Sequence, residues 1–306
     1  MSWKGLFISE PARLSMQRGQ LLLEQAAQKH SIPLEDLAFI VLDSPQITMT
    51  AALFAACAGN GCLIISTDNR HMPNGSLLSF HRFHRQMETM ELQISLSEPR
   101  KKRLWQTLIC QKITNQASCL HLLGFGEQKQ KLMNLVGKVG SGDPANTEGL
   151  AARLYWGSIG SGFKRDSEGE DRLNILLNYG YGLLRSVLSQ ALAAHGWLPC
   201  LGIHHHNRQN AFNLADDLIE PWRPFVDLQA IRLWQNTLDQ TEFNKNDRQQ
   251  MSEVLYMRVN LEGEDHILLS AMRYYAEQLF PYFKNREKSF LCPSFSLSAG
   301  SSKNEL

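Results

Sequence analysis

Residues 171–197 read DRLNILLNYGYGLLRSVLSQALAAHGW, and their apolar side chains recur at steps of three and four. That spacing places the apolar side chains on one face of an α-helix, which the fold must bury. The face consists of Leu173, Leu176, Leu177, Leu184, Val187, Leu188 and Leu192. Gly180 and Gly182 would each cost a helix about 1 kcal/mol relative to alanine. Their presence indicates that a neighbouring backbone or helix comes close to this one.

The helical pattern extends along the chain in both directions from this segment. Residues 103–124 and 130–140 have apolar side chains at three- and four-residue steps, and further amphipathic stretches lie between residues 228 and 283. We expect an all-α domain over residues 98–288. The small and polar segment 289–306 is expected to be a disordered tail.

The first part of the chain has a different pattern. Short apolar runs bounded by Pro, Gly or Asp are typical of β-strands, and they occur at residues 6–10, 13–16, 37–43 and 62–68. Thr48 or Thr50 can cap one helix over residues 51–58, and Gly59-Asn60-Gly61 can end it.

The predicted fold class is therefore α+β. A small N-terminal β-rich domain over residues 1–75 precedes a linker over residues 76–97, and the larger helical domain follows.

Composition describes a soluble globular protein. The chain has 306 residues, of which 43% are hydrophobic and 20% charged, and no apolar run approaches the roughly 20 residues that span a bilayer. The N-terminal sequence MSWKGLFISE lacks the apolar core of a secretory signal. Six cysteines without a CxxC pair indicate reduced thiols and no structural zinc site. We expect a cytoplasmic protein with no membrane partner.

Positive charge is concentrated in one segment. The net charge is +1, but residues 93–147 hold eight Lys/Arg against three Asp/Glu, a local net charge of +5. Such a segment suits a phosphate backbone. The run Arg100-Lys101-Lys102-Arg103 within it could equally be a solvated helix face.

Three carboxylates in two separate segments are candidates for metal binding. Glu148 follows Asn146-Thr147, either of which can cap a helix whose first turn holds it. Asp217 and Glu220 are three residues apart and share a helix face. Each of these carboxylates could instead have a purely structural role. Glu148 could be a first-turn carboxylate that interacts favourably with the helix dipole, and Asp217 and Glu220 could lie on an exposed acidic helix face.

Three consecutive histidines, His204, His205 and His206, precede the acidic pair, and one or two of them can point inward. A lone histidine is more often structural, but histidine can also bind metal or contact phosphate. Carboxylates together with imidazole suit Mg²⁺ or Mn²⁺. The combination points to metal-assisted chemistry on a phosphate.

Several long motifs resemble one known family. NTEGLAARLYW (146–156), LLNYGYGLLRSVL (176–188) and LGIHHHNRQNAFNLADDLIEPWRPFVD (201–227) resemble the CRISPR-associated integrase family called CRISPR-associated protein one, most closely its type II members. SIPLEDLAFIVLDSPQITMT (31–50) and LIISTDNRHMPNGSL (63–77) resemble its N-terminal β-rich domain. The resemblance covers residues 1–285 with the motifs in the same order.

The resemblance implies a ligand set. The family's N-x-E-G-x-x-A-R pattern matches residues 146–153 and selects Glu148, and its histidine matches His205 in the turn that begins at Gly202. Its third ligand is the acidic residue before P-x-R-P, here Glu220, with Asp217 as an auxiliary ligand or orienter. Mg²⁺ or Mn²⁺ held there would polarise the scissile phosphate and activate the attacking hydroxyl.

The family also implies an activity and partners. Its members insert short foreign DNA fragments as new spacers into the CRISPR array by 3′-OH attack on a phosphodiester, and with water as nucleophile the same site would be an endonuclease. The N-terminal domain would serve dimerisation and partner docking. Two homodimers would grip a dimer of a second small CRISPR-associated adaptation protein in a heterohexamer, and the type II effector nuclease and an accessory protein are further expected partners.

Phosphate contacts are expected from basic and imidazole side chains around these motifs. The candidates are Arg153, His204, Arg208, Arg223 and the run Arg100-Lys101-Lys102-Arg103. Arg153 could instead be a buried partner of an acidic ligand. Two other functions stay open, namely a branched-DNA repair nuclease that uses the same residues and a non-catalytic scaffold that holds DNA.

Overall fold

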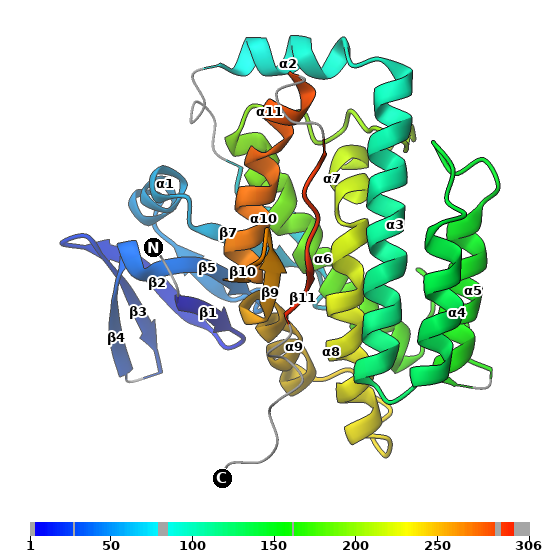
Figure 1. Cartoon of the computed structure of the whole chain (residues 1–306). Coiled ribbons are helices and arrows are strands. Elements are labelled where there is room, and N and C mark those ends of the chain that lie inside the picture. The colour runs from blue at the N-terminus through cyan, green and yellow to red at the C-terminus, as the bar shows by residue number, and fades with distance from the viewer. Residues whose placement is uncertain (1–3, 27, 79–84, 161, 285–288, 297–306) are drawn as a thin grey trace. The chain divides into compact units, whose positions relative to one another are not determined.

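The structure is a computed structural model that describes residues 4–26, 28–78, 85–160, 162–284 and 289–296. The chain divides into two compact units, Met1–Arg82 and Phe83–Leu306 (Figure 1). Strands dominate the first unit and helices the second, which confirms the predicted α+β fold class. No helix in the described part of the chain is long and apolar enough to cross a membrane.

In its described residues, the first unit has two sheets, a helix and a short 3₁₀ turn. One sheet has the order β1-β5-β7-β8 and the other β4-β3-β2-β6. The pairs β1/β5 and β5/β7 are parallel, whereas β2/β3 and β3/β4 are antiparallel. The elements are β1 (Lys4–Ile8), β2 (Ala12–Gln17), β3 (Gln20–Gln25), β4 (Gln28–Pro33), η1 (Leu34–Asp36), β5 (Leu37–Leu42), β6 (Ile47–Met49), α1 (Ala51–Asn60), β7 (Leu63–Thr67) and β8 (Pro73–Ser76).

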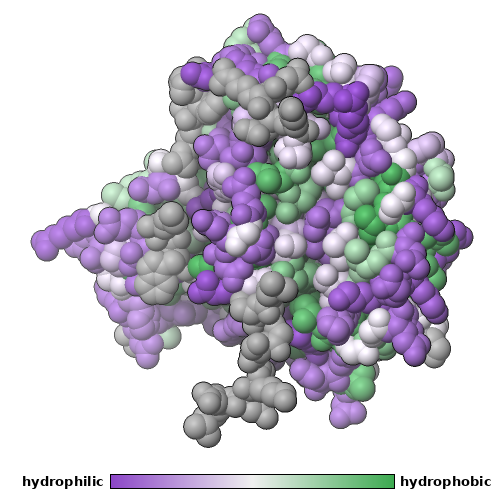
Figure 2. Space-filling view, in the orientation of Figure 1, coloured by the Kyte–Doolittle hydropathy of each residue, from purple (hydrophilic) through white to green (hydrophobic). Residues whose placement is uncertain are grey.

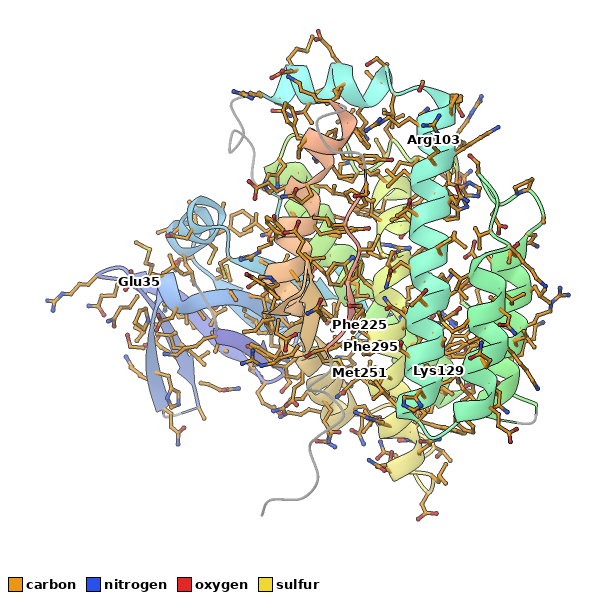
Figure 3. The ribbon with its side chains drawn as sticks, viewed as in Figure 1. Glu35, Arg103, Lys129, Phe225, Met251 and Phe295 are labelled. Carbon is orange, nitrogen blue, oxygen red and sulfur yellow. The ribbon has the colours of Figure 1, made fainter. Side chains whose placement is uncertain are left out.

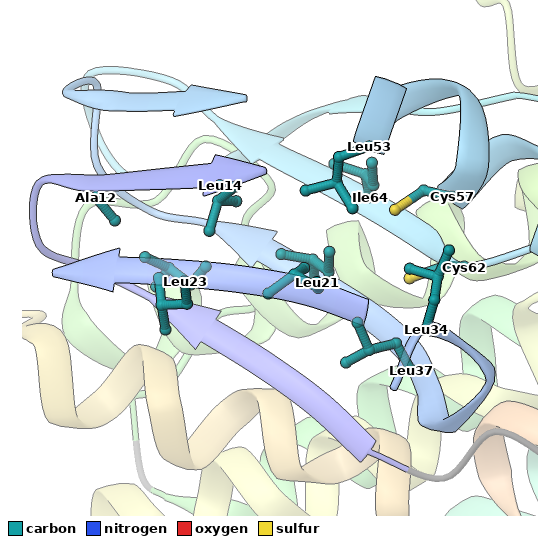
Figure 4. Packing of buried hydrophobic residues seen from close by; sticks show 12 residues of the cluster. Ala12, Leu14, Leu21, Leu23, Leu34, Leu37, Leu53, Cys57, Cys62 and Ile64 are labelled. Carbon is teal, nitrogen blue, oxygen red and sulfur yellow. The ribbon is translucent and has the colours of Figure 1, made fainter. Parts of the chain in front are cut away.

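The predicted helix and its caps are present as α1. The Thr50 side chain accepts a hydrogen bond from the Leu53 N–H at 3.4 Å, and Gly61 ends the helix at φ 71°. Leucines from both sheets and from α1 point into one shared core in Figure 4, where Leu14, Leu21 and Leu53 are fully buried.

The second unit is a group of helices around α3 and α6. Its helical elements are α2 (Gln86–Ile94), α3 (Glu98–Leu122), α4 (Gly126–Val136), α5 (Thr147–Ile159), α6 (Arg172–Ala194), α7 (Asn213–Leu218), η2 (Glu220–Trp222), α8 (Arg223–Asn236), α9 (Lys245–Ser252), η3 (Glu253–Tyr256), α10 (Leu268–Glu277) and α11 (Leu279–Phe283). Within this unit α3 packs between α8 on one side and the pair α4 and α5 on the other (Figure 1). The predicted apolar face of α6 is buried along its whole length.

Gly180 of α6 confirms the expected close approach. A Cβ atom added there would lie closer than 3.0 Å to the side chains of Val226 in α8 and Met251 in α9. Helix α6 can therefore cross α8 at this distance only with glycine at the crossing point.

The boundary between the two units falls inside the predicted linker. The chain divides after Arg82, and the linker passes into helix α2 at residues 86–94. Residues 79–84 of that linker lie outside the described part of the chain.

The second unit also contains a small sheet that the all-α prediction lacks. Its order is β10-β9-β11, with β9 (Arg258–Leu261), β10 (Glu264–Ile267) and β11 (Ser294–Phe295). Strand β11 lies in the segment 289–306 that was predicted to be disordered. Phe290 is buried, and Phe295 packs against Phe225 with ring centroids 4.2 Å apart (Figure 3). The prediction is wrong for residues 289–296, because these aromatic side chains bury apolar surface; residues 297–306 lie outside the described part.

Candidate active site

Glu148 lies in the first turn of α5, as predicted. Asn146 is the N-cap at φ 51°, and its side chain accepts a hydrogen bond from the Gly149 N–H at 3.1 Å. The Asp143 carboxylate accepts from the N–H groups of Thr147 and Glu148, each at 2.9 Å. Because Asn146 and Asp143 satisfy the first N–H groups of the helix, the Glu148 side chain is free of capping and can turn toward α3.

The histidine segment is folded around Asp217 of α7. The carboxylate, fully buried, accepts hydrogen bonds from the N–H groups of Ile203 at 2.6 Å, His204 at 2.8 Å and His205 at 3.1 Å. It also lies 2.5 Å from Nδ1 of His205. A Cβ atom on Gly202 would lie closer than 3.0 Å to the backbone oxygen of His205, so this turn requires glycine. These contacts support the orienting role of Asp217.

Asp217 sets the electrostatics of His205. The hydrogen bond from the imidazole to this carboxylate raises the pKa of His205 above its ordinary value, with burial opposing it. A neutral imidazole whose Nδ1–H donates to Asp217 has its Nε2 lone pair available to a metal ion. Asn213 holds the same segment from the other side, because its side-chain amide donates to the carbonyls of Cys200 and Asn207.

His204 has a different environment from its neighbour. Its ring stacks on Trp105 of α3 with centroids 4.0 Å apart and planes 3° from parallel. Partial burial lowers the pKa of His204, although Asp217 acts in the opposite direction. His204 is thus a largely neutral ring on an aromatic surface at neutral pH.

Glu220 is the first residue of η2, and its side chain is only 5% exposed. Its Oε1 lies 3.0 Å from Nε of Arg223, whose guanidinium also lies over the Tyr181 ring at 4.7 Å. Burial favours the neutral acid, but Arg223 and Lys112 together lower the pKa of Glu220, which is therefore ionised.

Lys112 of α3 joins the two glutamates that the sequence proposes as ligands. Its Nζ lies 2.5 Å from Glu148 Oε1, to which it donates a hydrogen bond, and 2.5 Å from Glu220 Oε2. The second contact is equally short and pairs the ammonium with a glutamate side chain that is only 5% exposed. Burial opposes the charge on Lys112, but Glu220 and Glu148 raise its pKa above the ordinary value.

Lys112 was not predicted from the sequence as a site residue. There it stood out only as one of the basic residues in the segment 93–147. A signal was available, because Trp105, Lys112 and Asn115 are spaced by seven and three residues and so share one face of a helix.

Glu148, Glu220 and Nε2 of His205 are the donors that could hold a metal ion. Two carboxylates and an imidazole are a suitable donor set for Mg²⁺ or Mn²⁺, and the buried Glu220 Oε2 already contacts a cation, the Lys112 ammonium at 2.5 Å. Over the described ranges, no three His, Cys, Asp or Glu side chains stand together as a ready metal cluster. The two glutamates instead share the Lys112 ammonium.

The predicted phosphate-binding residues fall into two groups. Arg153, Arg208 and Arg103 are exposed and form no ion pair with any residue that the structure describes. The exposure of Arg153 rules out the alternative that it is a buried partner of an acidic ligand. Lys102 is also exposed at the start of α3.

The other candidates have partners within the protein. Arg223 pairs with Glu220, and Lys101 pairs with Glu98 at 2.9 Å. Arg100 donates to the Tyr282 carbonyl, and its guanidinium lies over the Tyr282 ring at 4.3 Å. These three side chains are therefore less available to DNA than the exposed arginines.

Comparison with known proteins decides the family. A sequence profile of the family described as CRISPR associated protein Cas1 matches residues 6–258. A CRISPR-associated endonuclease Cas1 from Neisseria meningitidis is 37% identical over 273 residues, which cover 89% of this chain and 89% of the relative. The chain belongs to the Cas1 family. The resemblance inferred from the motifs is confirmed.

Solved structures share the Cas1 fold of this chain. A structure titled "Casposase bound to integration product" superposes with a TM-score of 0.75 at 16% identity, covering 99% of this chain and 95% of the other. A chain of a Cas6-RT-Cas1–Cas2 complex gives a TM-score of 0.71 at 20% identity over 94% of this chain and 35% of the other. At these identities the likeness concerns the fold.

Proposed function

We propose that this Cas1-family chain is a metal-dependent DNA endonuclease and strand transferase that inserts short DNA fragments into a CRISPR array. The main support is the position of Lys112 in α3. Its ammonium lies 2.5 Å from both Glu148 and Glu220, which are 72 residues apart in sequence. Support also comes from the Neisseria relative, which is named an endonuclease, and from the casposase, which was solved with an integration product.

The residues of the chain have separate parts in this proposal. Glu148, Glu220 and His205 would hold Mg²⁺ or Mn²⁺, which supplies Lewis-acid activation of a phosphate and of an attacking hydroxyl or water. Asp217 would fix the His205 ring by its contact with Nδ1. Arg223 would stabilise Glu220 in its ionised form. Exposed Arg153 and Arg208 would contact the DNA backbone.

The proposed partners follow from the family. The Cas6-RT-Cas1–Cas2 complex contains a Cas1 part assembled with Cas2. By analogy this chain would form homodimers, two of which join a dimer of the small second adaptation protein in a heterohexamer that carries DNA in the cytoplasm. The type II effector nuclease and an accessory protein are further proposed partners.

The test is strand transfer of a labelled DNA fragment into a leader–repeat target with Mg²⁺ or Mn²⁺ and the small partner protein. Glu148→Gln should lower the rate at least about a hundredfold, because it removes a proposed ligand. Glu127→Gln is the matched control, since Glu127 has the equivalent first-turn position in α4 and is exposed. A normal rate for the Glu148 variant would refute the metal assignment.

The same assay separates the alternatives. A repair nuclease would cut ordinary branched DNA without the small partner or the leader–repeat target. A scaffold would bind DNA but show no strand transfer with either metal ion.

A further inference from the structure

Lys112 stands where an ion shared by Glu148 and Glu220 would stand. Two oxygens that each lie 2.5 Å from one nitrogen can be no farther apart than twice that distance, 5.0 Å. Oxygens bound to one Mg²⁺ at about 2.1 Å are about 4 Å apart or less. The two carboxylates are therefore already close to the separation that a common divalent ion requires.

We propose that Lys112 is a positioning residue that serves as a resident counter-ion of the metal site. It holds Glu148 and Glu220 together, leaves them when the divalent ion binds, and then pairs with a phosphate of the bound DNA. This inference rests on the proposed function, because it takes the two glutamates as metal ligands.

The ammonium and a divalent ion cannot share this position. Both would contact the same two oxygens, and their like charges would repel strongly at such a short separation in a site where Glu220 is 5% and Lys112 12% exposed. Each glutamate has two oxygens, but Glu220 Oε1 is already paired with Arg223 at 3.0 Å. Binding of the metal to Glu220 Oε2 therefore requires Lys112 to move.

The movement belongs to the Lys112 side chain and not to its helix. Asn115, one turn further along α3, is fully buried and donates to the carbonyls of Pro221 at 2.7 Å and Pro293 at 2.9 Å. These bonds fix α3 against η2, which carries Glu220. Lysine has a flexible four-carbon stem, so its ammonium can change partner while the backbone stays in place.

Charge balance indicates which group the Lys112 ammonium would pair with after it leaves the glutamates. The charges of Glu148, Glu220, Lys112 and Arg223 cancel one another. A divalent ion adds two positive charges to this set, and each DNA phosphate that binds there neutralises one of them. A lysine ammonium with three donors suits a phosphate oxygen. Metal binding should therefore strengthen DNA binding, and DNA should strengthen metal binding by the same factor.

The first experiment uses the unmodified protein and maps lysine reactivity by reductive methylation and mass spectrometry. Lys112 should react slowly without divalent ions, about fivefold faster or more with Mn²⁺, and slowly again with Mn²⁺ and DNA. Exposed Lys131 serves as an internal reference, because Mn²⁺ should not alter its reactivity. Unchanged protection of Lys112 on addition of Mn²⁺ would overturn the inference.

The second experiment measures Mn²⁺ affinity by calorimetry without DNA. Lys112→Met removes the competing ammonium and should tighten Mn²⁺ binding by about tenfold, whereas Lys112→Arg keeps a cation and should bind Mn²⁺ more weakly than Lys112→Met. Lys131→Met is the control for loss of a lysine charge. Equal or weaker Mn²⁺ binding by folded Lys112→Met would contradict the counter-ion role. If that variant does not fold, the methylation result decides.

Glu148→Gln in the same calorimetry separates this inference from the proposed function. If it does not weaken Mn²⁺ binding, the proposed metal site is wrong and the inference falls with it. If it weakens binding while Lys112 stays protected in the wild-type protein, only the inference is wrong.

Discussion

Two neighbouring aspartates in α7 show how single residues acquire different roles. Asp217 is fully buried and accepts hydrogen bonds from the N–H groups of residues 203–205. Asp216 points elsewhere, because successive residues of a helix are rotated by about 100°, and it pairs with Arg185 at 2.7 Å. Replacing either with alanine would therefore have different effects, namely loss of the histidine turn for Asp217 and loss of a partly exposed ion pair for Asp216.

Asp227 leads to a prediction about pH. Burial raises the pKa of its carboxyl from 3.8 to about 6, although Tyr181 donates a hydrogen bond to it. The folded protein therefore holds a proton on Asp227 that the unfolded chain releases between about pH 4 and 6, and the free energy of unfolding falls as pH rises through that window. Asp227→Asn removes this dependence. The unfolding free energy of the variant minus that of wild type should rise by roughly 2–3 kcal/mol from pH 4 to pH 7.

Urea unfolding across that pH range measures the difference directly. A difference in unfolding free energy that stays constant with pH would reflect lost or gained hydrogen bonds and carries no information on the ionisation of Asp227. Parallel pH profiles would show that the Asp227 carboxyl has the same pKa in the folded and unfolded states.

Site residues were predictable from sequence where the signal is local. Asn146 and Glu148 belong to one cap and one helical turn, and Asp217 and Glu220 are three residues apart, so local spacing is informative. Lys112 was missed because its contacts reach 36 residues along the chain to Glu148 and farther to Glu220. Only the packing of α3 against α5 and η2 brings these charges together.

Secondary-structure elements, like site residues, were predictable where the sequence signal is local. The long helices α3 and α6 have apolar faces that repeat over many turns, and both were predicted. Strand β11 has two residues, and its partner β9 lies over thirty residues earlier, as the pair Phe295 and Val259 shows. A strand this short contains no measurable period, so its pairing depends on tertiary contacts such as that between Phe295 and Phe225.

The close crossing of helices α6 and α8 can be tested by substituting Gly180. Gly180→Ala should lower the free energy of unfolding by about 1–3 kcal/mol, because the new methyl group overlaps Val226 and Met251. In a Val226→Ala background the same change should be neutral or stabilising by up to about 1 kcal/mol, since space is available and alanine favours a helix. Thermal or urea unfolding of the four proteins of this double-mutant cycle measures the coupling. Equal effects in both backgrounds would show that Gly180 does not limit the approach.

At the scale of the whole molecule, positive charge is concentrated in one segment, so the proposed DNA binding would be local. The net charge is only +1, and the local excess lies in residues 93–147. Hydrophilic residues cover the start of α3 in Figure 2, where Arg103 projects from the helix in Figure 3. Lys112 is about 15 Å further along α3 than Lys102 at 1.5 Å per residue. In the proposed function, this one helix would contact DNA phosphates at its start and the reacting phosphate near its middle.

This arrangement predicts different salt dependences for different basic side chains. Arg103→Ala and Arg208→Ala remove exposed guanidinium groups, and each should reduce the slope of log Kd for DNA against log salt concentration by about 1, as expected for one lost phosphate contact. Lys101→Ala is the matched control on α3, because Glu98 already pairs with Lys101 at 2.9 Å, and its slope should change less. Arg100→Ala should instead lower thermal stability, since its guanidinium packs on Tyr282. Fluorescence anisotropy with labelled duplex at several salt concentrations gives the slopes. Equal slopes for all four variants and wild type would place the DNA path away from the start of α3 and from the histidine turn.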